Sequence, residues 1–156
     1  MQPSDANLRR YLAEAEFWNG NFDKAGELFE ATVQGQPRRS HPKQMLAWLK
    51  GSSPFAKFRD GKKGIELIES LVEVRGNQSP SILETMAVCL ADVGKFDEAL
   101  TMQRQALKAI EDGSSLEKYN DEQKKALRDR MELYKRKREY RLANVNEVPM
   151  KLLGEN

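Results

Sequence analysis

The sequence of 156 residues is poor in the side chains on which enzymes and metal sites depend. Cysteine and histidine occur once each, as Cys89 and His41. A single cysteine excludes an internal disulfide and a cysteine-based zinc site, and it is typical of a reducing compartment. With one histidine, a serine or cysteine nucleophile has a single possible base, and no glycine-rich phosphate loop is present. We therefore expect a packing role for Cys89, no cofactor, no metal and no enzyme activity.

Long apolar runs and an excess of one charge are missing as well. The apolar runs cover a few residues, whereas a membrane-spanning helix needs about 20. The 26 basic and 24 acidic residues leave a net charge of +2, which by itself favours no class of partner. The first residues lead into a charged segment and lack the apolar stretch of a secretory signal. The sequence therefore predicts a cytoplasmic protein without a membrane partner, or a piece of a longer chain.

What the chain does contain is an internal repeat. The run GNFDKA at residues 20–25 returns as GKFDEA at residues 94–99, and a degenerate copy, DGKKG, lies at residues 60–64. Internal repeats indicate a solenoid, in which each unit buries its apolar face only against a neighbour. Once the surplus residues of a Ser/Pro-rich loop at 52–58 are set aside, the copies follow a period of about 34 residues. A large apolar residue followed by a small one then falls in register three times, as Leu12-Ala13, Leu46-Ala47 and Met86-Ala87.

The spacing of apolar residues predicts an all-α protein. They recur at intervals of three and four, and the alternation typical of strands is absent. We expect helices at about residues 5–18, 22–33, 40–51, 59–75, 80–93, 96–111 and 120–140. A single domain over residues 1–141 would hold three helix-turn-helix repeats, at about 6–38, 40–77 and 79–112. A helix within about 117–140 would cap this stack, and residues 142–156 would form a tail.

These units resemble tetratricopeptide repeats over about residues 6–111. The resemblance rests on the large-small pairs and on the small residue that opens each second helix, which is Ala25, Gly64 or Ala99. The sequences LAWL at 46–49, SP at 53–54 and RDG at 59–61 are similar to a variant associated with bacterial repeat proteins. The resemblance implies a right-handed superhelix whose first helices line a concave groove. It implies a non-catalytic scaffold that binds a peptide or a protein in that groove.

The groove would be lined by side chains that face away from the second helix of each unit. By spacing, these are Arg10, Glu14, Phe17, His41, Gln44, Trp48 and Glu84. Trp48 has a broad ring with one N–H group, which suits the centre of an interface. The alternative is that Trp48 packs as core against the loop that carries Phe55 and Phe58. Glu14 would repel a carboxylate, so we do not expect the groove to grip a partner's C-terminal carboxylate.

A basic cluster near the C-terminus is the second candidate site. It consists of Lys135, Arg136, Lys137 and Arg138, flanked by Tyr134 and Tyr140. Clustered bases suit phosphate contacts, so nucleic-acid binding is an alternative function. An apolar stripe formed by Leu127, Met131 and Tyr134 instead favours a helix that only caps the repeats, and we prefer this interpretation. A third interpretation makes the chain a structural segment of a larger protein.

The tail is unusually apolar for a chain end. Its apolar residues are Leu142, Val145, Val148, Met150, Leu152 and Leu153. We expect the tail to dock in the groove of its own chain. Docking in the groove of a second copy, and hence self-association, is the alternative.

Overall fold

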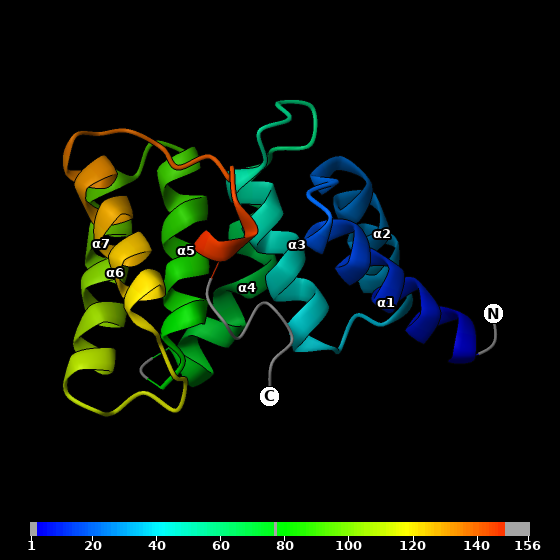
Figure 1. Cartoon of the computed structure of the whole chain (residues 1–156), viewed down its shortest axis with the longest axis horizontal. Helices are drawn as coiled ribbons and strands as arrows, with labels where there is room; N and C mark the ends of the chain where they lie inside the picture. The colour runs from blue at the N-terminus through cyan, green and yellow to red at the C-terminus, as the bar shows by residue number, and fades with distance from the viewer. Residues whose placement is uncertain (1–2, 77, 149–156) are drawn as a thin grey trace.

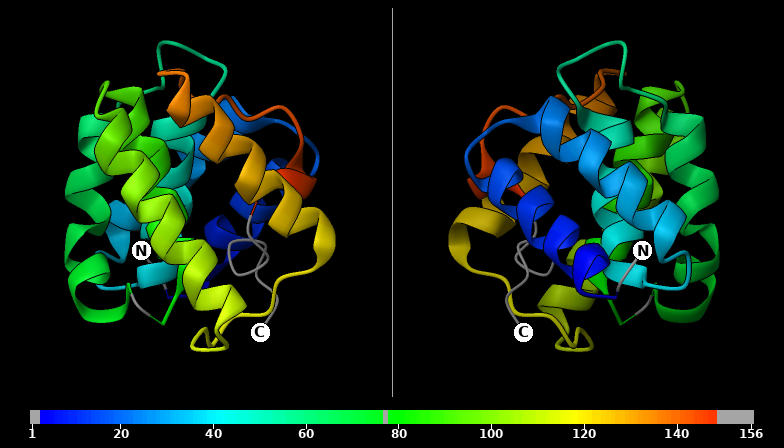
Figure 2. Two further views of the ribbon diagram at one scale, coloured as in Figure 1. Left: turned by 90° about the vertical axis from the view of Figure 1, so that its left-hand side faces the viewer. Right: turned by 90° about the vertical axis from the view of Figure 1, so that its right-hand side faces the viewer.

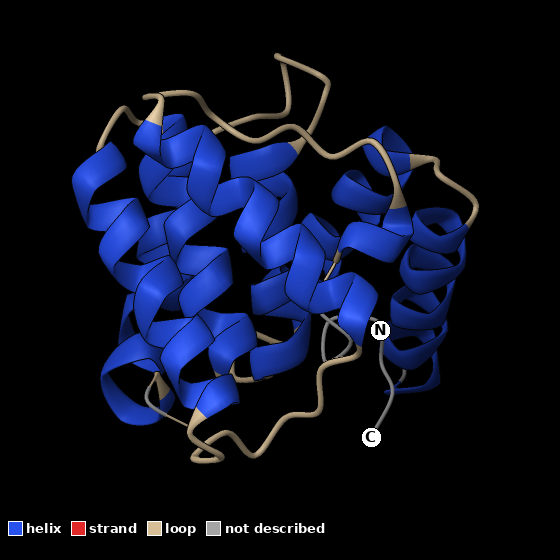
Figure 3. Cartoon of the chain, turned by 60° about the vertical axis from the view of Figure 1, so that its left-hand side comes forward, coloured by secondary structure: helices blue, strands red, loops and turns tan. Residues whose placement is uncertain are grey.

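The computed structural model describes residues 3–76 and 78–148, and Figure 1 shows that this part of the chain is a stack of helices. Its elements are α1 (Pro3–Trp18), α2 (Phe22–Gly35), α3 (Ser40–Ser52), α4 (Gly61–Arg75), α5 (Pro80–Asp92), α6 (Phe96–Glu111), α7 (Asp121–Lys135) and the 3-10 turn η1 (Val145–Glu147). No strand occurs in these residues (Figure 3). The prediction of an all-α protein is confirmed, and the first six helices lie within a few residues of their predicted positions.

The helices pack as consecutive pairs. Helix α1 packs on α2, α3 on α4, and α5 on α6, while α3 also contacts α2 and α5. The order runs from α1 and α2 at one end of the molecule to α6 and α7 at the other (Figure 1), and each pair of end helices faces the viewer in one panel of Figure 2. Helix α7 packs on α6 and on η1.

The repeated sequence forms the same turn at residues 20–25 and at residues 94–99. Gly20 and Gly94 have φ angles of 79° and 82°, in the left-handed region that glycine adopts without strain. In the first turn the N–H of Asn21 donates to the carbonyl of Glu16 at 2.9 Å, and in the second the N–H of Lys95 donates to that of Leu90 at 2.9 Å. These hydrogen bonds satisfy carbonyls in the last turn of the preceding helix, which have no donor within that helix. The turn therefore explains why glycine opens both copies.

Small residues recur where helices α3, α4 and α5 approach closely. A Cβ atom added to Gly64 would overlap the sulfur of Cys89, which explains why glycine replaces alanine in the middle repeat. The buried thiol of Cys89 donates to the carbonyl of Ala47 at 3.2 Å. Burial raises the pKa of this thiol, so it stays protonated and unreactive at neutral pH. Cys89 thus occupies a packing position.

The predicted length of the last helix is wrong. Helix α7 ends at Lys135, five residues before the expected limit, and Lys137 adopts a positive φ of 55°. The N–H of Lys137 donates to the carbonyl of Tyr134 at 3.0 Å, and the N–H of Arg138 donates to that of Leu133 at 2.9 Å. The chain leaves the helix at this turn, and Tyr140 is thereby buried in the main core.

Candidate interaction surfaces

The interior of the predicted groove is closed. Trp48 is 0% exposed, and Phe17, Gln44 and Glu84 are buried as well. The expectation that Trp48 lies in an open groove is therefore corrected, and Trp48 is a core residue. Its covering differs from the expected alternative, because the Tyr140 ring lies 6.0 Å from the Trp48 ring. Gln44 is used internally and donates to the hydroxyl of Ser81 at 2.9 Å.

A buried ion pair lies beside Trp48. The guanidinium of Arg130, on α7, donates to the carboxylate of Glu84, on α5, and both side chains are buried. The hydroxyl of Tyr119 donates to the other oxygen of Glu84, and the amide of Gln103 lies 3.3 Å from the first oxygen. Burial lowers the pKa of Arg130, but the Glu84 carboxylate and, after it, Tyr134 and Tyr140 together outweigh burial, so the pKa is raised. Glu84 is thus an internal partner of α7.

The cation of Arg130 also connects α7 to the C-terminal segment, defined here as residues 139–148. It lies 5.2 Å from the ring centres of both Trp48 and Tyr140, within range of cation–π attraction. Its Nη1 donates to the backbone carbonyl of Glu147 at 2.9 Å. Arg130 therefore holds the segment over the face that α3 and α5 present.

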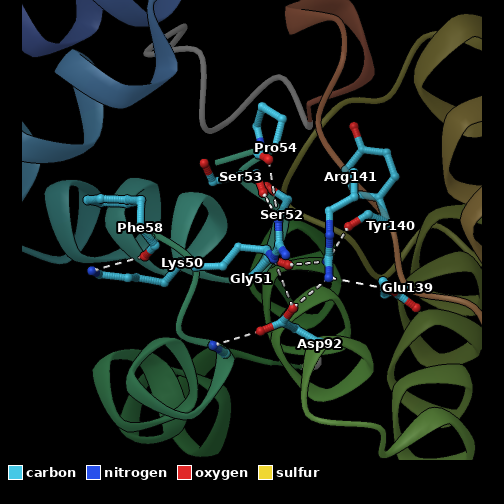
Figure 4. Close-up of polar contacts among 12 residues, drawn as sticks. Lys50, Gly51, Ser52, Ser53, Pro54, Phe58, Asp92, Glu139, Tyr140 and Arg141 are labelled. Atoms are coloured by element: carbon cyan, nitrogen blue, oxygen red, sulfur yellow. Dashed lines mark hydrogen bonds and ion pairs between the residues drawn. The ribbon is translucent and has the colours of Figure 1, made fainter. Parts of the chain in front are cut away.

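A second arginine fixes the start of the same segment (Figure 4). Arg141 Nη2 lies 2.9 Å from the Asp92 carboxylate, and Nη1 donates to the carbonyl of Gly51 at 3.3 Å. The N–H of Leu142 donates to the carbonyl of Ser52 at 2.7 Å. These donors satisfy carbonyls at the C-terminal end of α3, where the helix dipole favours positive charge. The segment is therefore tied to the ends of both α3 and α5.

The Asp92 carboxylate also helps to fix the position of the loop at residues 53–60. Arg59 Nη1 donates to the carbonyl of Ser53 at 2.9 Å, and Arg59 Nε lies 3.6 Å from the Asp92 carboxylate. The other oxygen of Asp92 accepts from the N–H of Gly61 at 3.0 Å. Asp92 thus joins the loop, the start of α4 and the C-terminal segment.

The described part of the tail packs on its own chain. Leu142 and Val148 are buried in the main core, and Val145 packs against it. This agrees with the expected intramolecular docking for residues 142–148. Met150, Leu152 and Leu153 lie outside the described residues.

Three of the predicted groove residues remain partly exposed and lie together. Arg10 Nη1 is 2.7 Å from the Glu14 carboxylate, and His41 Nδ1 is 3.8 Å from it. The guanidinium of Arg10 also lies over the ring of Tyr11, 4.3 Å from its centre. These residues form a polar cluster that joins α1 to the start of α3.

The outer face of α1 exposes several large apolar side chains, which sequence reasoning missed. Leu8, Tyr11, Leu12 and Trp18 are 67%, 58%, 45% and 44% exposed. Leu12 matches Leu46 and Met86 in the repeats, yet those two are only 2% and 7% exposed. In those two units a preceding helix pair packs on the first helix, as α2 does on α3 and α4 does on α5. We call Leu8, Tyr11, Leu12, Ala15 and Trp18 the α1 strip.

The basic cluster follows the end of α7 around a turn instead of lying along a helix. Lys135 is paired with Glu132 at 2.6 Å. Arg136, Lys137 and Arg138 are exposed, and no ion pair of theirs occurs in the described part of the chain. The cluster therefore presents three cations to solvent.

Neither a metal site nor a membrane-spanning helix is seen in residues 3–76 and 78–148. Within them no group of three or more His, Cys, Asp or Glu side chains is placed to hold a metal ion. No helix in this part is long and apolar enough to cross a membrane. No protein-family model matches the chain, and neither does any curated protein or solved structure.

Proposed function

We propose that this chain is a non-catalytic protein-binding module built from tetratricopeptide-like units, and that it binds its partner through the α1 strip. The observation that carries this proposal is the exposure of Leu12 at a repeat position where Leu46 and Met86 are buried. A repeat unit buries this position against a neighbouring helix pair. The α1 strip therefore resembles the surface on which a preceding helix pair packs in the other two units, but it is exposed.

The size and rim of the surface support the same proposal. The α1 strip exposes on the order of 400 Å² of apolar side chain on one helix, as large as patches that mark interaction sites. Arg10, Glu14 and His41 border it and supply a polar rim, as in most protein interfaces. In this proposal these three predicted groove residues contact the partner at its edge, and Trp48 does not.

We propose further that the three helix pairs form the right-handed superhelix that the resemblance implies, with α7 as its cap. The support is the shared turn at Gly20 and Gly94 and the contact between α3 and α5, the first helices of neighbouring units. The usual concave binding face would then be occupied by the chain's own C-terminal segment, which moves the partner site to α1.

The test compares affinity capture by the wild type with capture by Leu12→Glu, followed by direct binding of the captured protein to the purified chain. Val74→Glu is the matched control, because Val74 is 78% exposed on α4. We expect Leu12→Glu to lose a partner that Val74→Glu retains, with helicity unchanged by circular dichroism. Equal capture by both variants would contradict a partner site on α1.

A second candidate function is nucleic-acid binding at the end of α7, and the observation that favours it is the exposure of Arg136, Lys137 and Arg138. Binding by phosphate contacts falls steeply with salt concentration, so the affinity for a duplex should drop strongly between about 50 mM and 200 mM salt. Replacing the three bases with glutamine should abolish this binding. Affinity that is independent of these bases would rule the candidate out.

A further inference from the structure

We propose that the partner at the α1 strip is a second copy of this chain, and that the two α1 helices pack antiparallel. This inference rests on the proposed function, because it names the occupant of the same surface. It follows from the spacing of the strip, from its charges and from the nature of the other end of the molecule.

Without Leu12, the residues of the α1 strip have the same spacing in both directions along the helix. Leu8, Tyr11, Ala15 and Trp18 are separated by three, four and three residues, which are the intervals of the seam between two coiled helices. In an antiparallel pair this spacing places Leu8 against Trp18 of the second copy. It also places Tyr11 against Ala15 of the second copy, so a large ring meets a small side chain. Large side chains on one α1 helix therefore fit the spaces beside small side chains on the α1 helix of the second copy.

The borders of the strip fit the same arrangement. Leu12 lies next to the two-fold axis, so the Leu12 side chains of the two copies meet and lengthen the apolar contact. On the other border the Glu14 carboxylates of the two copies approach each other, which is unfavourable for like charges. Each is neutralised within its own chain, because Arg10 lies 2.7 Å from Glu14. The apolar seam is therefore not opposed by an unpaired charge.

The other end of the molecule excludes a head-to-tail chain of copies. Helix α7 exposes charged side chains there, among them Asp121, Glu122, Lys125, Arg128, Asp129 and Glu132. An apolar strip that packed on this surface would bury these charges at a high cost. A strip that meets only itself gives a two-fold contact, and such a contact closes at two copies.

The area of contact indicates that the dimer is weak. Two strips of this size bury less than the roughly 1,200 Å² of the smallest stable interfaces, so the pair belongs with transient contacts. We expect sedimentation velocity of the full chain to show mainly monomer at about 5 µM and a large dimer fraction at about 500 µM. Leu12→Glu should remain monomeric throughout this range, while Val74→Glu should behave as the wild type. A wild type that stays monomeric at about 500 µM would overturn the dimer.

Cross-linking through engineered cysteines tests the antiparallel register. The native thiol of Cys89 is buried and gives little background. Leu12→Cys lies within about 3 Å of its equivalent along the helix axes and should form a disulfide-linked dimer on mild oxidation. Leu8→Cys lies about 15 Å from its equivalent along the same axes and should not, although it should link to Trp18→Cys when the two proteins are mixed. Self-linked Leu8→Cys, or the absence of any Leu12→Cys dimer, would overturn this register.

The outcomes separate this inference from the function on which it rests. A chain that is monomeric throughout, but loses a captured protein on Leu12→Glu, would overturn the dimer and leave α1 as a binding surface for another protein. A chain that dimerises through residues other than the strip would overturn this inference alone. Equal capture of a partner by Leu12→Glu and Val74→Glu would overturn the proposed function as well.

Discussion

Replacing Arg130 with methionine should be among the most damaging single changes in this protein. Methionine keeps most of the apolar volume of the arginine stem but removes the charge that faces Glu84. Glu84 would keep the Tyr119 hydroxyl and the Gln103 amide as partners but would lose its only ion-pair partner in the described residues. Breaking a buried ion pair in this way costs about 3–5 kcal/mol.

Two further losses add to this value. The carbonyl of Glu147 loses its hydrogen bond from Arg130, which is worth about 1 kcal/mol. The attraction between the cation and the Trp48 and Tyr140 rings disappears as well, at about 0.5–2 kcal/mol. Because domains of this size are stable by only about 5–15 kcal/mol, Arg130→Met should remove a large share of the free energy of unfolding.

Urea unfolding monitored by circular dichroism measures this loss, with Arg128→Met as the matched control. Arg128 is on the same helix, but its ion pair with Glu111 is exposed to solvent. We expect the control to cost less than about 1 kcal/mol. The double variant Glu84→Gln with Arg130→Met should recover part of the loss, since no unpaired charge then stays buried. An Arg130→Met variant that is no less stable than Arg128→Met would refute the assignment of a buried ion pair.

Three further predictions concern other parts of the core. Arg141→Ala removes the contact with Asp92 and should cost about 1–2 kcal/mol in urea unfolding, a modest value because Arg141 is partly exposed. Gly64→Ala should lower the melting temperature by an amount that corresponds to about 1–3 kcal/mol, and Cys89→Ala in the same chain should recover part of it, since the overlap is with that sulfur. Burial, followed by the charge of Glu84, raises the pKa of Tyr119, so its contribution is complete below the unfolded-state pKa of about 10 and is lost as the pH rises above it. The urea midpoint should therefore fall between about pH 9 and pH 11, and this fall should be smaller in Tyr119→Phe.

The helices were predictable because their signals are local. Apolar spacing, the proline at Pro80 and the glycines at the two turns act within a few residues, and these elements lie where the sequence placed them. The end of α7 was not predictable in the same way. Residues 135–138 are good helix formers, and the tertiary contact of Tyr140 with Trp48 outweighs their preference.

The closed groove could not be predicted from local patterns. The sequence favours a groove position for Glu84, because its partner Arg130 lies 46 residues further along the chain. A carboxylate within an apolar helix is compatible with a ligand and with an internal partner, and the sequence alone does not distinguish them. For the α1 strip the difficulty is different. The sequence shows that its residues are apolar, but it does not show that no other helix covers them.

Residues 139–148 cover the face that α3 and α5 present, which we call the closed face. The contacts of this segment define what any competing peptide would have to supply. A segment that displaces residues 139–148 must cover Trp48, satisfy the carbonyl of Ser52 and provide a cation for Asp92. The outer surface of α7 offers charged side chains to solvent, and ion pairs formed there would be weak and sensitive to salt. A partner that binds the α1 strip does not have to displace any segment of the chain, since the apolar side chains of the strip are already exposed. Association driven by apolar burial should therefore begin at α1, and a peptide that enters the closed face should resemble the Tyr140–Arg141–Leu142 sequence that it replaces.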